Sequence, residues 1–195
     1  MKPPSLRLVD VERAAELFLK KFNPSGKIPI PIEEIVELEM KIVIVVVPGI
    51  KKLLGIDAFI SSDFTQITID EYAFTTYPDR TKFSIAHEIG HLVLHANWYQ
   101  TFGPKTLDDY FSFHDRIDAQ TYKHIEIQAS TFAGLILVPK NILLNTLKEK
   151  LGKIPIEENL EILIPVFQDL LDLFKVSGEV LLRRLQKEHI VKSNY

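Results

Sequence analysis

Cysteine is absent from this chain of 195 residues. Its absence excludes disulfide bonds, zinc sites built from thiolates and a cysteine nucleophile, although it does not fix the cellular compartment. Long apolar runs are absent as well, since the longest, IVIVVVPGI and GLILVP, are far shorter than the roughly 20 residues that cross a bilayer. The first 22 residues carry charges throughout and lack the apolar centre of a signal peptide. We therefore expect a cytoplasmic protein that does not enter a membrane.

The chain also lacks a strong excess of either charge. It has 23 Lys and Arg against 26 Asp and Glu, which gives a net charge of −3. Its most basic short stretch, LLRRLQKEH at 181–189, already contains Glu188. Direct binding of nucleic acid relies on a basic surface and is therefore not expected. With 46% hydrophobic and 25% charged residues, the composition is ordinary for one globular domain, which needs no metal merely to fold.

Hydrophobic periodicity predicts an α+β protein with few strands. KIVIVVV suits a buried strand, and IDAFISS and QITID look like a hairpin, so we expect a small antiparallel or mixed sheet of about three strands. Helical periodicity also begins at Pro78, in the segment discussed below. The other predicted helices are 6–22, a short one from Pro31, 121–139, 140–152, 156–174 (interrupted by Pro165) and 177–189.

The segment FSIAHEIGHLVLH, residues 83–95, places three histidines and a glutamate in an apolar stretch. His87 and His91 are four apart, so on a helix their imidazoles project from one face, one turn apart. That spacing lets one nitrogen of each ring reach a shared ion at zinc–nitrogen distances of about 2.0–2.1 Å. Glu88 lies about 100° around the helix from His87 and can flank the ion without binding it. Gly90 costs the helix about 1 kcal/mol relative to alanine, and its missing side chain leaves room for a close neighbour.

This arrangement suits metal-assisted hydrolysis. The ion polarises a carbonyl and lowers the pKa of its water, while the glutamate accepts the proton and passes it to the leaving amine. The HExxH pattern also arises by chance, mostly on exposed polar helices. Here the flanking residues are apolar on nearly every side, which is typical of a buried helix. Because unpaired imidazoles and a carboxylate would be costly there, we interpret the segment as a metal site.

A catalytic site of this kind needs a third protein ligand. The metzincin pattern would place glycine at 94 and histidine at 97, and it fails because the chain has Leu94 and Asn97. His95 could continue the row of ligands. However, three successive turns spread the rings over about 12 Å, so a supporting or capping role is favoured for His95.

Glu126, in EIQASTFA on the next apolar helix, is the better candidate for the third ligand. A carboxylate among apolar neighbours needs a partner for the same reason as the histidines. The alternative is a surface glutamate on the polar side of that helix. His124, His114, Asp115 and Asp118 are further possible ligands, and the residues alone leave this choice open.

Together these residues resemble the ImmA/IrrE family of metallopeptidases. The matching pattern is Arg80 shortly before FSIAHEIGH, with His95 soon after. A helix of the form E-x-x-A-x-x-F-A, ending in proline, follows from Glu126 to Pro139. The segment DLFKVSGEVLLRRLQKEHIV is similar to that family's closing part. The resemblance spans roughly residues 28–192, and its metal motif is far more specific than its ends.

The resemblance implies a zincin-like helical core packed against the small sheet, with extra C-terminal helices. The expected organisation is a single metallopeptidase-like domain over residues 1–195. Its catalytic core would cover 28–140, and a C-terminal helical part would cover 141–195.

The resemblance also implies His87, His91 and Glu126 as metal ligands and Glu88 as the catalytic base. A site with two histidines, one carboxylate and an open position suits Zn²⁺ best, with Mn²⁺ or Fe²⁺ as alternatives. Characterised members of the family cut a partner helix-turn-helix repressor. The expected function is therefore a zinc-dependent intracellular endopeptidase of narrow specificity, with such a repressor or a similar regulator as its protein substrate.

Two other functions stay open from the sequence. One is a non-proteolytic protein that binds a regulator, like a partner in an antitoxin–toxin pair, with a structural or vestigial metal site. The other is a metal hydrolase that acts on a small amide.

Three segments match the family less specifically. Residues 96–121 are long, aromatic and without a clear period, and we expect a connection that shapes access to the site. Arg80 is expected to pair with an acid near the start of the helix rather than to act in catalysis. VSGEVLLRRLQKEHIV resembles the second half of a helix-turn-helix, but its apolar residues Val180, Leu181, Leu182 and Leu185 are expected to dock on the domain.

Overall fold

A computed structural model describes residues 3–192 of the chain, apart from the side chain of His114. Its sheet has three strands, β1 (Val43–Val47), β2 (Ala58–Ile60) and β3 (Gln66–Asp70), in the order β1-β3-β2. β1 runs parallel to β3 and pairs with it from Val43↔Gln66 to Val47↔Asp70. β2 runs antiparallel to β3, from Ala58↔Ile69 to Ile60↔Ile67. The predicted α+β class, the hairpin and a mixed sheet of three strands are therefore confirmed.

The burial predicted for the first strand is wrong. β1 is an edge strand, and Val43 and Val46 are 57% and 38% exposed. A run of β-branched residues indicates extended backbone but does not say which faces neighbouring elements cover. The buried strand is β3, whose Ile67 and Ile69 are fully buried in the middle of the sheet.

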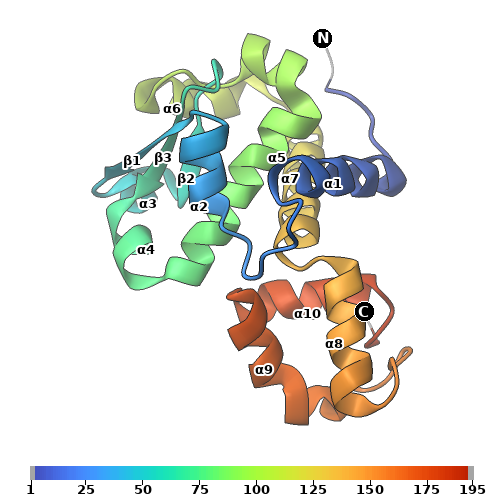
Figure 1. Cartoon of the computed structure of the whole chain (residues 1–195). Helices are drawn as coiled ribbons and strands as arrows, with labels where there is room; N and C mark the ends of the chain where they lie inside the picture. Colours follow the sequence, from blue (N-terminus) through green and yellow to red (C-terminus); the bar gives the residue numbers. More distant parts are fainter. Residues whose placement is uncertain (1–2, 193–195) are drawn as a thin grey trace.

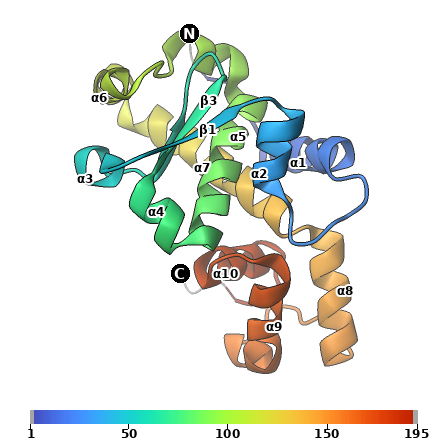
Figure 2. The same ribbon diagram turned by 60° about the vertical axis from the view of Figure 1, so that its left-hand side comes forward.

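Helices make up most of the remaining chain (Figures 1 and 2). Within the described residues no single helix is both long and apolar enough to cross a membrane, although the bent pair 119–137 and 140–151 passes that test together by length and composition. The helices are α1 Leu8–Phe22, α2 Ile32–Glu34 with its π-helical continuation η1 Ile35–Glu39, α3 Ile50–Leu54, α4 Glu71–Thr76, α5 Pro78–Phe102, α6 Leu107–Arg116, α7 Ala119–Leu137, α8 Lys140–Leu151, the 3₁₀ turn η2 Leu160–Leu163, α9 Ile164–Phe174 and α10 Gly178–Lys187.

The stretch after Ala96, expected to be an irregular connection, is mostly helical. α5 continues to Phe102, α6 covers ten residues, and α7 begins at Ala119 after Asp118 accepts a hydrogen bond from the Thr121 amide at 2.9 Å. Aromatic side chains stabilise this path, because the Phe113 ring lies 6.3 Å from Trp98 and 6.0 Å from Tyr99 between ring centroids. Such contacts join two helices, so a search for period along one segment does not detect them.

The prediction that Pro165 interrupts a helix is wrong. It lies in the first turn of α9, where a missing amide hydrogen costs little, and the preceding turn is the 3₁₀ segment η2. The C-terminal apolar residues Val180, Leu181 and Leu185 are buried, as expected for a docked helix, while Leu182 is half-buried.

α5 and α7 lie side by side through the middle of the molecule (Figure 1). The sheet lies on one side of α5, and α1 packs on α7, where the Phe18 and Phe132 rings meet edge to face at 5.6 Å. α8, α9 and α10 gather beyond the C-terminal end of α7 (Figures 1 and 2). α10 is tied back to that end by Arg184, whose Nε donates to the Val138 carbonyl at 3.0 Å.

Gly90 permits the close approach of the two central helices. A Cβ at this position would lie 2.9 Å from Cα and 3.0 Å from the carbonyl oxygen of Ala129. Both atoms belong to the α7 backbone, so they cannot swing aside. The sequence-based expectation that Gly90 leaves room for a close neighbour is confirmed, and the neighbour is the helix that carries Glu126.

We expect Gly90→Ala to lower the free energy of unfolding by about 1–3 kcal/mol, because overpacking outweighs the gain in helix propensity. Gly134→Ala, on α7, is the matched control, since a Cβ added there would meet nothing within 4 Å. That variant should be neutral or more stable by up to about 1 kcal/mol. Urea unfolding of both variants measures the difference, and a Gly90→Ala protein as stable as Gly134→Ala would contradict the packing argument.

Arg184 also forms a buried ion pair with Glu188, which accepts a second contact from Lys140 at 2.7 Å. Burial of Glu188 disfavours its charged form, but Lys140 and Arg184 outweigh this and lower the pKa of Glu188 below its ordinary 4.5. A carboxyl whose pKa is lowered on folding stabilises the protein above its unfolded pKa, and it loses that contribution as the pH falls.

Glu188→Gln should therefore lower the free energy of unfolding by about 1–3 kcal/mol near neutral pH. The difference from wild type should shrink as the pH falls below 4.5. Glu179→Gln, which removes an exposed pair with Arg183 on the same helix, should cost about 0–1 kcal/mol. Equal losses for both variants in urea unfolding would show that the buried network does not stabilise the docking of α10.

Candidate metal centre

Three predicted ligands meet between α5 and α7. His87 and His91 project from one face of α5, and Nε2 of His87 lies 3.1 Å from Nε2 of His91. Glu126 approaches from α7, with its carboxylate oxygens 3.1 Å from His87 Nε2 and 3.3 Å from His91 Nε2. Donors held about 2.0–2.1 Å from one tetrahedral ion lie about 3.3 Å apart. The spacing and the nitrogen and oxygen chemistry of these donors therefore fit a divalent metal ion.

Among the described residues, His87, His91 and Glu126 are the one group of this kind. The other candidate ligands do not join it. Asp118 caps α7, and Nε2 of His124 lies 2.9 Å from Nε2 of Gln128. Asp115 is an exposed residue of α6, and the side chain of His114 lies outside the described residues.

His95 lies behind His91, outside the group of three donors. It is 1% exposed, and its Nδ1 lies 3.3 Å from Nδ1 of His91. Burial and the neighbouring His91 lower the pKa of His95 to about 4. On the other histidine of the group, Nδ1 of His87 lies 3.2 Å from the Ser130 hydroxyl. The rings of His87 and His91 therefore both have a polar partner on the side that faces away from the three-donor group.

Charge compensation is already strong within the protein. Burial disfavours ionised Glu126, but the polar contacts with His87 and His91 outweigh it and hold the pKa of Glu126 well below its usual range. Burial likewise disfavours the charged form of His87, yet the contact with Glu126 raises the pKa of His87. The carboxylate thus has the charged form that a cation would require.

Glu88 lies beside this group without belonging to it. It is 6% exposed, and its Oε2 accepts a hydrogen bond from the Ile60 amide of β2 at 2.9 Å. Burial raises the pKa of Glu88, which makes its carboxylate a better proton acceptor than an exposed one. Ile60 therefore holds the side chain from the sheet while Oε1 accepts no hydrogen bond from the described residues.

The three-donor group opens into a cleft of about 910 Å³. Its walls come from β2, α5, α6, α7 and α10 and include Phe59, Tyr110 and Tyr122. Burial and the charge of Glu126 raise the pKa of Tyr122 to about 12, so this phenol is a neutral hydroxyl at physiological pH. Tyr99 also lines the cleft, and its ring stacks on His91 with centroids 5.1 Å apart.

Arg80 lines the same cleft and pairs with an acid, as expected. Its Nε donates to Oδ2 of Asp57 at 2.7 Å, at the start of β2. Lys51 contacts the other oxygen of Asp57 at 2.6 Å. The Asp57 carboxylate therefore has two cationic partners, and Arg80 holds the N-terminal end of α5 against β2.

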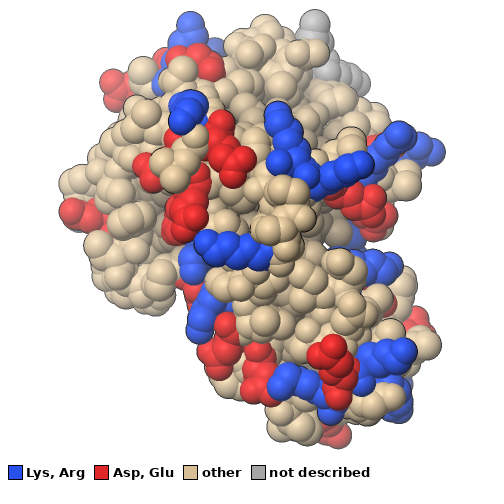
Figure 3. All heavy atoms as spheres, viewed as in Figure 1, with Lys and Arg blue, Asp and Glu red and all other residues tan. Residues whose placement is uncertain are grey.

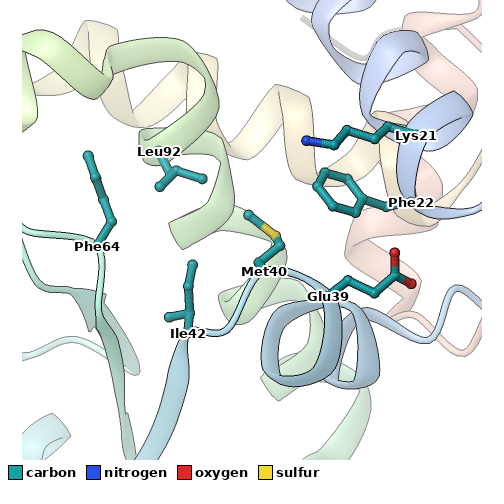
Figure 4. Close-up of a pocket in the computed structure, with 7 residues that line it drawn as sticks. All are labelled: Lys21, Phe22, Glu39, Met40, Ile42, Phe64 and Leu92. Atoms are coloured by element: carbon teal, nitrogen blue, oxygen red, sulfur yellow. The ribbon is translucent and has the colours of Figure 1, made fainter.

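A second hollow, of about 500 Å³, lies away from the donors (Figure 4). Phe22, Met40, Ile42 and Leu92 give it an apolar lining, and Lys21 and Glu39 lie at its side. It contains none of the three donors and no histidine. The chemistry therefore belongs to the larger cleft.

A family model described as the IrrE N-terminal-like domain, Peptidase_M78, matches residues 67–186. The chain belongs to this family. The resemblance to ImmA/IrrE metallopeptidases is thereby confirmed, and the matched range contains the HEIGH helix and Glu126.

Comparison with solved structures supports the fold of this family member. A Mycobacterium tuberculosis transcriptional regulator is similar, with a TM-score of 0.56 and 17% sequence identity. The match covers 91% of this chain but 46% of that one, so the chain spans about half the length of this relative. No curated protein matches the chain.

Sequence reasoning missed several residues around the donors. Gln128 and Ser130 could have been found by the argument used for Glu126, since they are polar residues on the same largely apolar helix. Tyr99 and Tyr110 lay in the stretch expected to be irregular. The contributions of β2 and α10 to the cleft depend on tertiary packing and left no local signal.

We expect Glu126→Ala to weaken binding of a divalent ion by more than the 10–100-fold that loss of an outer hydrogen-bond partner costs. Elemental analysis of purified protein, with zinc titration against a chromophoric chelator, measures this. Glu149→Ala, an exposed position on α8, is the control and should bind as wild type does. Full metal content in Glu126→Ala would remove Glu126 from the ligand set.

Proposed function

We propose that this chain is a zinc-dependent endopeptidase of narrow specificity that cleaves a protein regulator, with helix-turn-helix repressors as the candidate substrates. The observation that carries the proposal is the convergence of His87, His91 and Glu126 on one point of a large cleft, with Glu88 alongside. These three residues would hold the ion. Zinc suits this donor set best, and manganese or iron could also be bound.

When bound, the ion would supply Lewis acidity to a water and to the scissile carbonyl. Glu88 would take the proton of that water on Oε1, because Oε2 is already held by the Ile60 amide. Its raised pKa favours this transfer and the later return of the proton to the leaving amine nitrogen.

The edge strand β2 favours a peptide over a small amide. Hydrogen bonds from Ser61 N to Gln66 O and from Asp70 N to Asp57 O flank β2 and fix which of its backbone groups face β3. The amide groups of Ala58 and Ile60 therefore point away from β3. Ile60 N contacts Glu88, and Ala58 lines the cleft. An extended peptide added beside β2 would lie along the donors.

The regulatory substrate is supported by family membership. A solved structure with the same fold is that of a transcriptional regulator, although this likeness concerns the fold. On the face shown in Figure 3, basic and acidic side chains are interspersed. That surface favours a protein partner over direct contact with nucleic acid.

Glu88→Gln should reduce cleavage at least 100-fold, within the range for loss of a general base, while zinc binding is retained. The glutamine oxygen can still accept the Ile60 hydrogen bond, so the fold should persist. The assay incubates zinc-loaded protein with each helix-turn-helix protein encoded beside the gene and identifies fragments by mass spectrometry.

Glu149→Gln is the control for the Glu88 variant and should cleave as wild type does. Cleavage that survives in Glu88→Gln would exclude the assigned base. Repressor control that persists without cleavage would instead favour the non-proteolytic binding protein. Turnover of short amides alone would favour a small-molecule hydrolase.

A further inference from the structure

A continuous chain of polar contacts runs from His91 to the segment before α1. Nδ1 of His91 lies 3.3 Å from Nδ1 of His95, and Nε2 of His95 lies 2.8 Å from Oε1 of Gln128. Nε2 of Gln128 then donates to the carbonyl of Leu6 at 3.0 Å and lies 2.9 Å from Nε2 of His124. His91, His95 and Gln128 are each at most 5% exposed, so water does not substitute for these partners.

The Leu6 carbonyl sets the direction of this chain. A carbonyl oxygen only accepts hydrogen bonds, so the atom of Gln128 that faces it must be the amide nitrogen. The amide oxygen of Gln128 consequently faces His95. An oxygen needs a donor, and so Nε2 of His95 must carry the hydrogen.

The same reasoning extends from His95 to His91, the proposed metal ligand. His95 is buried and forms no ion pair with a described carboxylate, so its ring is neutral. Because its one hydrogen is on Nε2, its Nδ1 has a lone pair. Nδ1 of His91 faces that lone pair and has to donate. The lone pair of His91 is then on Nε2, the atom that faces His87 and Glu126.

We propose that Gln128 and His95 are positioning residues that hold His91 in the tautomer required for metal binding, with the Leu6 carbonyl as the fixed end of the chain. The inference rests on the proposed metal site. It assigns a role to the segment before α1, which is 122 residues from Gln128 in sequence. Docking of this segment and metal affinity are therefore linked.

The two histidine ligands differ in this respect. The partner of His87 is the Ser130 hydroxyl, which can donate or accept and so does not select a tautomer. Orientation of His87 is supported, whereas the hydrogen position of His91 is determined. Loss of this series of polar contacts should therefore change the tautomer of His91 and leave His87 unaffected.

Gln128→Leu tests the proposal, because leucine has a similar volume and no acceptor for His95. We expect zinc affinity, measured by competition with a chromophoric chelator, to fall about 10–100-fold. ¹⁵N NMR of the metal-free protein should show His91 with its hydrogen on Nδ1 in wild type. In Gln128→Leu, His95 can carry its hydrogen on Nδ1 instead, and a population of His91 with its hydrogen on Nε2 should appear.

His124→Leu is the matched control on the same helix. It removes one partner of Gln128 but leaves the Leu6 carbonyl, so zinc affinity and the His91 tautomer should match those of wild type. A second pair of variants, at His95, tests the proposal if Gln128→Leu fails to fold. A glutamine in His95→Gln can accept from His91 and donate to Gln128, so this variant should bind zinc more tightly than His95→Leu.

Wild-type affinity and an unchanged His91 tautomer in Gln128→Leu would overturn the proposal. So would equal zinc affinity in the two His95 variants. If wild type itself failed to bind zinc, the proposed function would fail, but the tautomer measurement on metal-free protein would still decide whether the polar chain orients His91.

Discussion

The close contact of α5 with α7 is the constraint on which the rest of the molecule depends. Gly90 lets the backbone of Ala129 approach within van der Waals distance of α5. Within one turn of this contact, the two helices carry the histidines and the carboxylate that converge. A wider separation would take from the buried His91 and the partly buried His87 and Glu126 the polar partners that they now share. Packing and chemistry are therefore one requirement here.

Polar groups in this interior occur in connected sets rather than singly. Glu126 lies within 3.3 Å of Nε2 of both His87 and His91, Glu88 accepts from the Ile60 amide, and His95 and Gln128 connect His91 to a backbone carbonyl. Each contact supplies the partner that burial would otherwise remove. Such sets also restrict geometry, because each donor must meet an acceptor. The region can consequently be stable as a folded core and still present lone pairs in a defined direction.

The cleft combines parts of the chain that are distant in sequence. The edge strand β2 forms one wall, the tyrosines of α5, α6 and α7 form another, and α10 closes the end. α10 is in place because Arg184 bonds the end of α7 and pairs with Glu188. α10 thus belongs to the site as well as to the fold. Family membership extends over this helix, since the matched range reaches residue 186.

The sequence by itself determined the local features: the HEIGH pairing on one helical face, the hairpin, the helix after it and the candidacy of Glu126. These follow from periods of two and 3.6 residues and from the cost of burying charge, which act within one segment. Only the tertiary structure decided that Glu126 rather than His124 joins the histidines, that β1 is exposed, that residues 96–120 are mostly helical, and that Gln128 reaches Leu6. Each of these depends on contacts between segments far apart in the chain, and no local pattern encodes which partner a side chain will meet.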